Sequence, residues 1–466
     1  MAETLIRKEL KEAFLEQGIQ DTHFFNGRLL TAGDLVKVQD ASRRRDHQLG
    51  LGVGSGIVSG LEVRLIADGS DGKPPVLAVS KGLAFDRLGQ AVALPQDAEV
   101  LLDKEKPDKL PPAGSFDYCV PLQQNGKPIP GKGAYLFTIR QASDYIGQAP
   151  RRGFGQTAKV EGCDRDLVLE GAQFRLVSVD VTNLDNLAET TRLALAELLK
   201  DTENAGLPGL SAQNKLRNWL AHACFGTEEL QGWLRDPFAR QANEFFGTAV
   251  DSSFHNYGVV GKLRSQGSID DCDVPLALIC WTATGVKWVD MWSVRRRLAA
   301  QALSAAWPQP TDDLRLAEAE AAFQQFQDQV NFLLQKLGPV TLVNAHATEY
   351  FRFLPAVGIL PGARGTFRGF NPNLFFDQPH RDVEYIDGLI VGSLVADALH
   401  YFPMDLESDE LVWLYQPWQN AKAIDDGANI QPYVVFTTGQ MPHRALARLD
   451  VARWDYSQYA DAVPGV

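Results

Sequence analysis

Residues 126–133 read GKPIPGKG and match the first seven positions of a phosphate-binding loop. Such a loop cradles phosphates with backbone amides, and the Ser or Thr that ends it holds magnesium. Here Gly133 takes that last position, and two prolines remove amide donors. A β-rich run, AYLFTIR, follows where a helix N-terminus should face the phosphate. We therefore predict a turn without a nucleotide.

His380-Arg381-Asp382 matches the triplet of the protein-kinase catalytic loop. Kinase chemistry also requires Asn five residues after the Asp and a DFG motif downstream. Position 387 is Asp, and the chain has no DFG. We predict instead that HRDVEYIDG opens a helix running to about residue 400, with its acids near the positive end of the helix dipole.

The glycines from 50 to 60, GLGVGSGIVSG, suggest a dinucleotide site at first sight. That fingerprint must follow a strand and open a helix. Here the run precedes a strand and is not GxGxxG in register. We expect the glycines to permit a tight turn and close backbone packing.

Metal ligation finds little support, because the eight histidines lie far apart without HExxH or HxH spacing. His346 and Glu349 share one helical face in HATE, but no further ligands can be nominated; His400 is expected to be a packed or capping residue. The five cysteines stand at 119, 163, 224, 272 and 280 without CxxC spacing. This pattern fits neither a zinc site nor a disulfide framework, so reduced thiols are expected.

Acidic pairs occur at 270–271, 312–313 and 425–426, all in polar stretches where solvated turns are expected. Two carboxylates suffice for glycoside hydrolysis, but nothing in the sequence selects a pair, and no GxSxG elbow is present. We predict no catalytic, cofactor-binding or metal-binding residues and a protein that is not an enzyme. A hydrolase of a cell-wall or surface polymer stays open as an alternative.

The 466 residues carry a formal net charge of -13, with 45% hydrophobic and 22% charged residues. This composition is ordinary for globular domains. The acidic balance argues against nucleic acid and anionic membranes as partners. The charged, amphipathic N-terminus is no signal peptide, and no run of 18 apolar residues exists to insert in a membrane. We expect synthesis in the cytoplasm and, for any role outside the cell, release by lysis.

Period and punctuation predict an α+β chain with several domains: small antiparallel β-modules, a helical insertion and a long helix between domains. A helix starts at Thr31, with Asp34 placed for a capping box, and ends near His47. β-rich runs fill 56–142 and 167–181, whereas 144–166 is loop-like. Helices follow to about 247. The expected units are a terminal helix (1–22), a helix plus β-domain (23–143), a β-domain with a helical insertion at about 186–250 (144–300), a helical strut (301–340) and an α+β domain (341–466).

Within the later units, YGVVGKL is expected to be β, and VPLALICWTATGVKWVDMW is expected to be a hairpin turning at Gly285. SVRRRLAAQALSAAW is expected to be a helix. A second helix runs from Thr311 to Gly338-Pro339, which is standard helix-stop punctuation. ELVWLYQPW, PYVVFTT and ALARLDVARW read as strands.

Both ends of the chain carry apolar residues suited to an interface. An amphipathic stripe contains Leu10 and Phe14, and the C-terminal tail contains Trp454, Tyr456 and Tyr459. Chain termini often become ordered only when they are tied down, and Trp and Tyr contribute strongly to interfaces. These five residues are the predicted interface, with sugar binding by exposed aromatics as the competing use.

The motif order resembles a family of proteins encoded with extracellular contractile injection systems and related phage tail-like particles. The resemblance rests on FFNGRLLTAGDL, GLGVGSGIVSGLEV and GLAFDRLGQAVALP, and extends to VPLALICWTATGVKWVDMWSVRRRL, EYFRFLPAVGILP and PHRALARLDVARWDYSQYA. It covers most of the chain outside 186–250, and this chain differs from the family pattern at Gly54-Ser55 and Gln90.

The resemblance implies a structural component of such a particle (baseplate, spike-surrounding or cap region) and no catalysis. The implied partners are other particle proteins, and a homo-oligomer of cyclic symmetry is expected. No cofactor is expected. A receptor- or glycan-binding module on the particle exterior is the main alternative.

Overall fold

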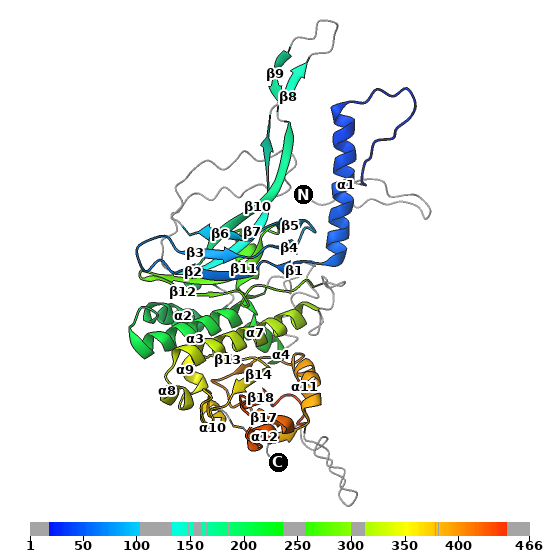
Figure 1. Ribbon diagram of the computed structural model, residues 1–466. Helices are drawn as coiled ribbons and strands as arrows, with labels where there is room; N and C mark the ends of the chain where they lie inside the picture. Colours follow the sequence, from blue (N-terminus) through cyan, green and yellow to red (C-terminus); the bar gives the residue numbers. More distant parts are fainter. Residues whose placement is uncertain are drawn as a thin grey trace, which may run out of the picture.

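A computed structural model describes residues 18–102, 133–147, 149–152, 160–164, 166–184, 187–235, 257–299, 313–377, 379–380 and 382–444. The chain is α+β, as predicted. A β-body lies beneath a projecting helix and ribbon, a helical layer lies under the β-body, and a second, smaller sheet lies beyond the helices (Figure 1). The expected domain boundaries stay predictions.

The β-body contains three antiparallel sheets, with strand orders β1-β4-β5, β2-β3-β6 and β10-β7-β11-β12. Their strands are β1 Gly56–Gly60, β2 Val63–Ala67, β3 Val76–Val79, β4 Gly82–Phe85, β5 Ala91–Leu94, β6 Ala98–Leu101, β7 Gly133–Ile146, β10 Leu167–Val179, β11 Val274–Thr282 and β12 Gly285–Asp290. A separate pair, β8 Ala149–Arg152 and β9 Val160–Asp164, continues the β7–β10 ribbon outward (Figure 1). The loop-like expectation for 144–166 is therefore wrong, because much of this stretch is paired strand.

The four-stranded sheet is buried on both faces, which explains why AYLFTIR and VPLALIC read as unbroken apolar runs. Successive strand residues point to opposite faces. Tyr135 and Phe137 join the core shared with the two small sheets, and Leu136 joins the core shared with the helices. The β11–β12 hairpin is confirmed, and Gly285 has the positive φ of 104° expected at its turn.

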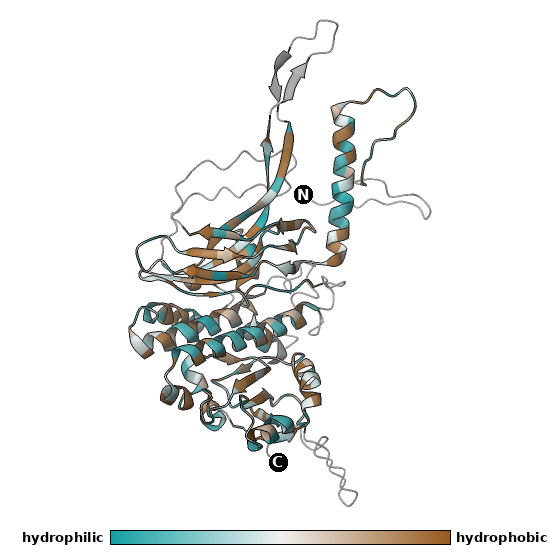
Figure 2. Cartoon of the chain, in the orientation of Figure 1, coloured by the Kyte–Doolittle hydropathy of each residue, from teal (hydrophilic) through white to brown (hydrophobic). Residues whose placement is uncertain are grey.

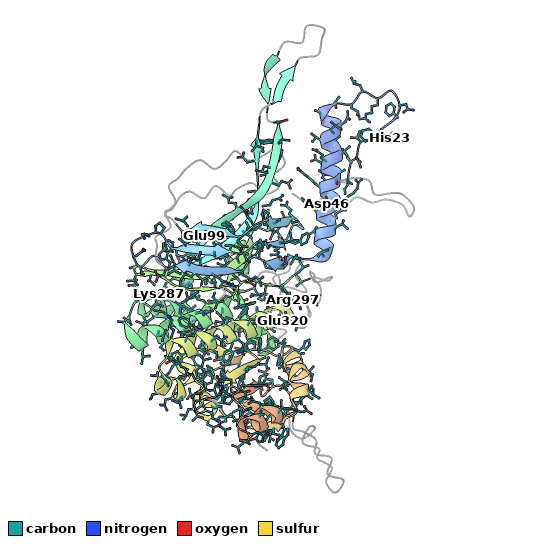
Figure 3. The ribbon with its side chains drawn as sticks, viewed as in Figure 1. His23, Asp46, Glu99, Lys287, Arg297 and Glu320 are labelled. Carbon is teal, nitrogen blue, oxygen red and sulfur yellow. The ribbon has the colours of Figure 1, made fainter. Side chains whose placement is uncertain are left out.

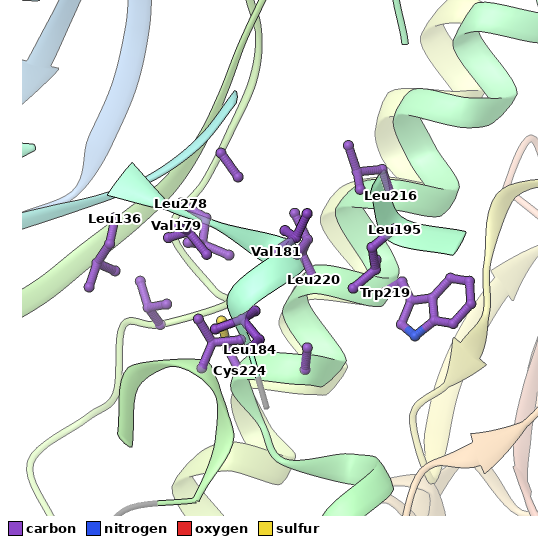
Figure 4. Packing of buried hydrophobic residues seen from close by; sticks show 14 of the residues in the cluster. Leu136, Val179, Val181, Leu184, Leu195, Leu216, Trp219, Leu220, Cys224 and Leu278 are labelled. Atoms are coloured by element: carbon purple, nitrogen blue, oxygen red, sulfur yellow. The ribbon is translucent and has the colours of Figure 1, made fainter. Parts of the chain in front are cut away.

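The helical layer covers the other face of this sheet. It consists of η1 Val181–Asn183, α2 Glu189–Asp201, α3 Gly206–Cys224, α4 Thr227–Arg235, α6 Gly258–Ser265 and α7 Asp313–Lys336. In Figure 4, Leu216 and Leu220 of α3 and Leu195 of α2 belong to one cluster with Val179 of β10 and Val181 of η1. The predicted helical insertion is present over the described part, and the long helix ends at Lys336, just before Gly338-Pro339.

The last part of the chain forms a second sheet of order β14-β18-β17-β15, with α7 on one face. Phe326 of α7 packs on Phe436 of β18, with ring centroids 5.2 Å apart. The elements are α8 Pro339–Val343, α9 Ala347–Tyr350, β13 Phe353–Leu354, β14 Val357–Pro361, α10 Pro372–Phe375, β15 Glu384–Ile386, η3 Gly388–Ile390, α11 Val391–Ala398, β16 Met404–Asp405, β17 Val412–Pro417, α12 Trp418–Asp425 and β18 Tyr433–Thr438.

Three segments differ from their predicted type because tertiary contacts override local pattern. YGVVGKL forms α6, which buries Val259 and Leu263 one turn apart. The described residues 293–299 of SVRRRLAAQALSAAW form a turn followed by an extended segment at 296–299. The Ile57 amide donates to the Arg296 carbonyl at 2.9 Å. The helix expected at 382–400 starts only at Val391, after β15 has paired with β17.

The long helix α1, Ala32–Val53, begins at the predicted capping box. The Thr31 hydroxyl accepts the Asp34 amide at 3.2 Å, and the Asp34 carboxylate accepts the Thr31 amide at 3.0 Å. The helix runs past the expected end at His47, because the first glycine with positive φ in this region is Gly54, at 104°. Gly50 instead serves close packing, since a Cβ there would lie 2.0 Å from the Gly89 carbonyl oxygen. The motifs GLGVGSGIVSGLEV and GLAFDRLGQAVALP therefore meet where α1 crosses the turn that contains Gly89.

We expect Gly50→Ala to destabilise the protein by about 1–3 kcal/mol, the usual cost of overpacking. The added methyl would force the base of α1 away from the turn at Gly89. Gly52→Ala is the matched control: its Cβ meets nothing within 4 Å, so it should stabilise the helix by about 0.5–1 kcal/mol. Urea unfolding measures both variants. Equal effects of the two substitutions would contradict the assigned crossing.

Candidate assembly surface

The five residues predicted as an interface, Leu10, Phe14, Trp454, Tyr456 and Tyr459, lie outside the described residues. Their role stays a prediction. Residues 126–132 of GKPIPGKG also lie outside the described residues. β7 begins at Gly133 and contains AYLFTIR, which the sequence predicts to be a strand. The strand expected at ALARLDVARW lies almost wholly in the same undescribed region.

The other motif residues do not converge. His380 of the kinase-like triplet forms an isolated β-bridge with Val412. His346 Nδ1 lies 2.6 Å from Asp377, which also accepts a hydrogen bond from the Thr348 hydroxyl at 2.6 Å. The acidic partner of His346 is therefore Asp377 and not Glu349, the residue that the HATE spacing suggested. Among the residues that the structure describes, no three His, Cys, Asp or Glu side chains are grouped to hold a metal ion.

A cavity of about 150 Å³ lies between the β-body and the helical layer. Its polar lining includes Asp86, Tyr257, Arg264, Arg296 and Glu318. The Tyr257 hydroxyl donates to Glu318 at 2.6 Å, and Arg315 also pairs with Glu318. Much of this polar lining is therefore engaged in packing the layers together.

Two buried groups, Cys224 at this cavity and His222 two residues before it in α3, are poorly suited to chemistry at neutral pH. Burial raises the pKa of Cys224 to about 12, so its thiol stays protonated. Burial, with the nearby Arg352 cation, lowers the pKa of His222 to about 3, so its ring stays neutral. Nucleophilic cysteines need a lowered pKa, and a general acid or base works best near neutral pKa. Neither group meets that requirement.

The expectation of reduced thiols is wrong at Cys272, which is disulfide-bonded. Cys224 and Cys280 are free and buried. Spacing alone did not reveal the bridge, because sequence separation does not fix which cysteines the fold brings together.

Asp86 organises the turn between β4 and β5. Its Oδ1 accepts the amides of Leu88 and Gln90 at 2.9 and 2.8 Å. The carboxyl group is buried, and Oδ2 has no hydrogen-bond partner within the described part of the chain. Burial raises the pKa of Asp86 to about 6, against the opposing effect of those two amides.

Because the folded pKa of Asp86 lies above its ordinary value of 3.8, the folded state binds this proton more tightly than the unfolded chain. The contribution of Asp86 to stability is then greatest at low pH and is lost as pH rises through about 6. We expect Asp86→Asn to gain stability relative to the wild type at pH 7.5 compared with pH 4.5. Urea unfolding of both proteins at the two pH values measures this, and a pH-independent difference would contradict it.

An ion-pair network joins the β-body to the loop before β11. Arg140 lies 3.3 Å from Asp270, Arg175 pairs with Asp273, and Thr138 donates to Asp273 at 3.2 Å. Asp271 lies 3.6 Å from Arg264. The acidic pair at 270–271 lies at a turn, as expected, and the Asp271 side chain is half exposed, but Asp270 is more buried and pairs with Arg140. The sequence could not reveal the pairs made by Arg140 and Arg175, because these residues are 130 and 98 positions from Asp270 and Asp273.

A second buried network fastens three elements. Arg217 of α3 donates through Nε to Asp290 of β12 at 2.5 Å and pairs with Asp328 of α7. Asp290 also accepts the Ser293 amide at 2.9 Å and Gln325 at 3.3 Å. The Asp290 side chain has no exposed surface. This network ties the sheet, α3 and α7 together within the β-body and the helical layer, which we call the base of the molecule.

In contrast, α1 and the outer ribbon project from this base with little cover. We call α1, the segment 18–31 and the outer ribbon (141–147 and 166–172) the arm. Of the 22 residues of α1, only Asp34, Ala41 and Gly50 are buried. Figure 2 shows α1 largely polar in its middle, beside a ribbon that is hydrophobic in its outer part. In Figure 3 His23 lies near the free end of the arm and Asp46 along α1.

Apolar side chains of the arm are exposed to an unusual degree. The exposed fractions reach 61% at Phe25, 83% at Leu29 and 57% at Leu167. The other exposed large apolar residues of the arm are Phe24, Leu30, Leu35, Val36, Leu49, Leu51, Val53, Ile146, Val168 and Leu169. A group of exposed large apolar side chains is typical of an interaction surface. A two-stranded ribbon and a lone helix are also only marginally stable without further packing.

No family model matches the chain, and no curated protein matches it. Across the described residues, no helix is both long enough and apolar enough to cross a bilayer. The candidate site is therefore defined by geometry alone: a base fastened by buried ion pairs, and an arm with little cover from the described residues. Sequence reasoning did not single out the outer ribbon, because apolar β-runs such as LVL look alike whether they are covered or exposed.

Proposed function

We propose that this protein is a non-catalytic structural subunit of a contractile phage tail-like injection particle, and that it joins the particle through its arm. The observation that carries the proposal is the number of exposed apolar side chains on an arm that projects from a base fastened by buried ion pairs. The type of particle is supported by the resemblance of the sequence motifs.

The energetic basis is simple. Fully burying a side chain such as Phe or Leu contributes about 1.5–3 kcal/mol, so covering the arm supplies a large driving force for docking. The net charge of -13 keeps free subunits soluble before assembly. The buried Arg217–Asp290 pair keeps the base unchanged while the arm binds.

The test is to image particles from cells with and without the gene, and to measure by quantitative mass spectrometry how many copies purified particles contain. We expect particles of the deletion strain to be incomplete or to lack defined density, and expression of the wild-type chain to restore it. Complete, contractile particles from deletion cells, or purified particles devoid of the chain, would contradict the proposal.

Binding of a receptor glycan is a second candidate, favoured by one observation at the opposite end of the molecule. Trp418 and Tyr385 are 55% and 49% exposed, with ring centroids 6.2 Å apart and planes at 85°. Asp387 and Gln419 beside them are joined by a 2.9 Å hydrogen bond. A glycan array with the wild type and Trp418→Ala tests this: specific binding lost in the variant would favour it.

A further inference from the structure

The end of α1 lies directly on the turn between β4 and β5. A Cβ added to Gly89 in this turn would lie 2.3 Å from the His47 carbonyl oxygen and 2.6 Å from the Leu51 nitrogen. The two backbones are therefore in contact without side chains between them, and a change in the turn displaces the end of α1. We call residues 47–51 of α1 and the turn 86–90 the joint.

Beyond the joint, α1 has weak support from the described part of the chain. Three of its residues are buried, and one of these, Gly50, belongs to the joint. The ion pair of Arg43 with Glu170 on the ribbon has side chains that are 32% and 55% exposed, and exposed pairs of this kind contribute little. Apart from its covalent continuation into β1, α1 is therefore fixed on the β-body mainly at the joint.

One carboxyl group sets the shape of the turn in the joint. Asp86 Oδ1 accepts the amides of Leu88 and Gln90, and the Asp86 carbonyl accepts the Gly89 amide at 3.2 Å. Asp86 is only 2% exposed, and its Oδ2 has no hydrogen-bond partner among the described residues. A buried carboxylate in this position is costly while it is charged.

The cations around Asp86 are engaged elsewhere. Arg87 of the turn and Arg264 of α6 each lie 3.6 Å from Asp271. Arg296 donates to main-chain carbonyl oxygens of its own segment. Across the described ranges, Asp86 therefore forms no ion pair that would offset its burial.

The acids around Asp86 add to the cost of its charge. Burial first, and then the charges of Asp270 and Asp271, raise the pKa of Asp86 to about 6. The other titratable groups of the adjoining cavity are already bonded to partners or stay neutral thiols; they are Asp273, Glu318, Tyr257 and Cys224. The geometry of the joint thus leaves one buried carboxyl group without a counter-ion.

We propose that the joint is a pH-dependent fastening, in which protonation of Asp86 holds α1 to the β-body and ionisation of Asp86 lets the turn open. Ionised Asp86 reaches water only if the turn moves, because its Oδ2 is covered in the closed joint. The turn then leaves the end of α1, and α1 loses its main fixed point. This inference goes beyond the particle role and does not depend on it, since it concerns the attachment of α1 within one chain.

Low pH should close the joint, and higher pH should loosen it. In the open joint Asp86 meets water and has its ordinary pKa of 3.8, whereas in the closed joint its pKa is about 6. The closed form gains from the proton below 3.8 and loses that gain as pH rises to about 6. His47 would act in the opposite sense, because burial lowers its pKa and its protonation at low pH would loosen the joint. The direction of the effect therefore identifies the group.

Hydrogen exchange of the full chain at pH 4.5 and 7.5 tests the joint, with protection expressed relative to the intrinsic exchange rate of each amide at that pH. The probes are peptides that cover 47–54 and 86–91, and a peptide around Val435 is the internal reference. We expect the joint peptides to be on the order of tenfold less protected at pH 7.5 than at pH 4.5. The change should be complete by about pH 6, and the reference peptide should not change.

Two variants assign the effect to one side chain. Asp86→Asn keeps an acceptor for the turn amides without the charge, so it should show the closed level of protection at both pH values. Asp97→Asn is the matched control: Asp97 also accepts a main-chain amide, that of Lys81, at 2.8 Å, but it is exposed. This variant should keep the pH dependence of the wild type.

Joint peptides that are protected equally at both pH values, or better at pH 7.5, overturn the inference. An Asp86→Asn chain that keeps the wild-type pH dependence overturns it as well. If that variant does not fold, the wild-type profile between pH 4.5 and 7.5 decides alone, because a protection that falls with rising pH and levels off near 6 is expected only from Asp86. None of these outcomes affects the particle role, which is tested by occupancy in particles.

Discussion

Arg217→Ala is expected to lower the free energy of unfolding by about 3–5 kcal/mol, the cost of leaving a buried charge without its partner. Arg217 is the only described cation paired with Asp290, whose side chain has no exposed surface. Its loss would also free Asp328 of α7, so the sheet and two helices would lose their common fastening. Urea unfolding at pH 7 measures the effect.

The matched control is Arg297→Ala, which removes a 2.6 Å pair with Glu320, also on α7. Figure 3 labels both residues near the junction of the β-body and α7. Their side chains are 44% and 41% exposed, so this pair should contribute at most about 1 kcal/mol. Similar losses in the two variants would contradict the claim that the buried pair fastens the base.

The combined substitution Phe24→Ser with Phe25→Ser is expected to reduce incorporation into particles more than 100-fold. Both rings are more than half exposed in the free chain, so the stability of the free subunit should change by no more than about 0.5 kcal/mol. If the particle buries them, the loss is about 3–6 kcal/mol of binding energy. Quantitative mass spectrometry of purified particles measures occupancy.

The control for that substitution is Val340→Ser with Leu389→Ser, which removes two apolar residues that are 77% and 89% exposed far from the arm. These substitutions should leave occupancy unchanged. Equal losses for both pairs would show that general surface hydrophobicity, and not the arm, governs incorporation.

The parts of the fold that depend on local pattern were predictable. The Thr31–Asp34 capping box, the turn at Gly285 and the helix ending at Lys336 follow from short-range rules. The burial of β7 on both faces also follows from the sequence. A strand that is covered on both sides needs apolar residues at nearly every position, as in AYLFTIR.

The parts that depend on distant partners were not predictable. Residues 296–299 are extended because the open edge of β1 supplies hydrogen bonds that no local propensity encodes. Asp270 and Asp290 look like ordinary turn and strand residues until Arg140 and Arg217 are brought beside them. The proposed assembly surface depends on the exposure of side chains such as Leu167. The sequence does not show whether the folded chain covers such a side chain.

Hydrogen exchange of free and particle-bound subunits tests the central claim most directly, since it reports which backbone amides are protected by assembly. Our account predicts strong additional protection over α1 and the outer strand residues 167–172 in the particle, with the sheet around Val435 unchanged. Protection confined to the region of Trp418 and Tyr385, with the arm exchanging as in the free chain, would contradict it.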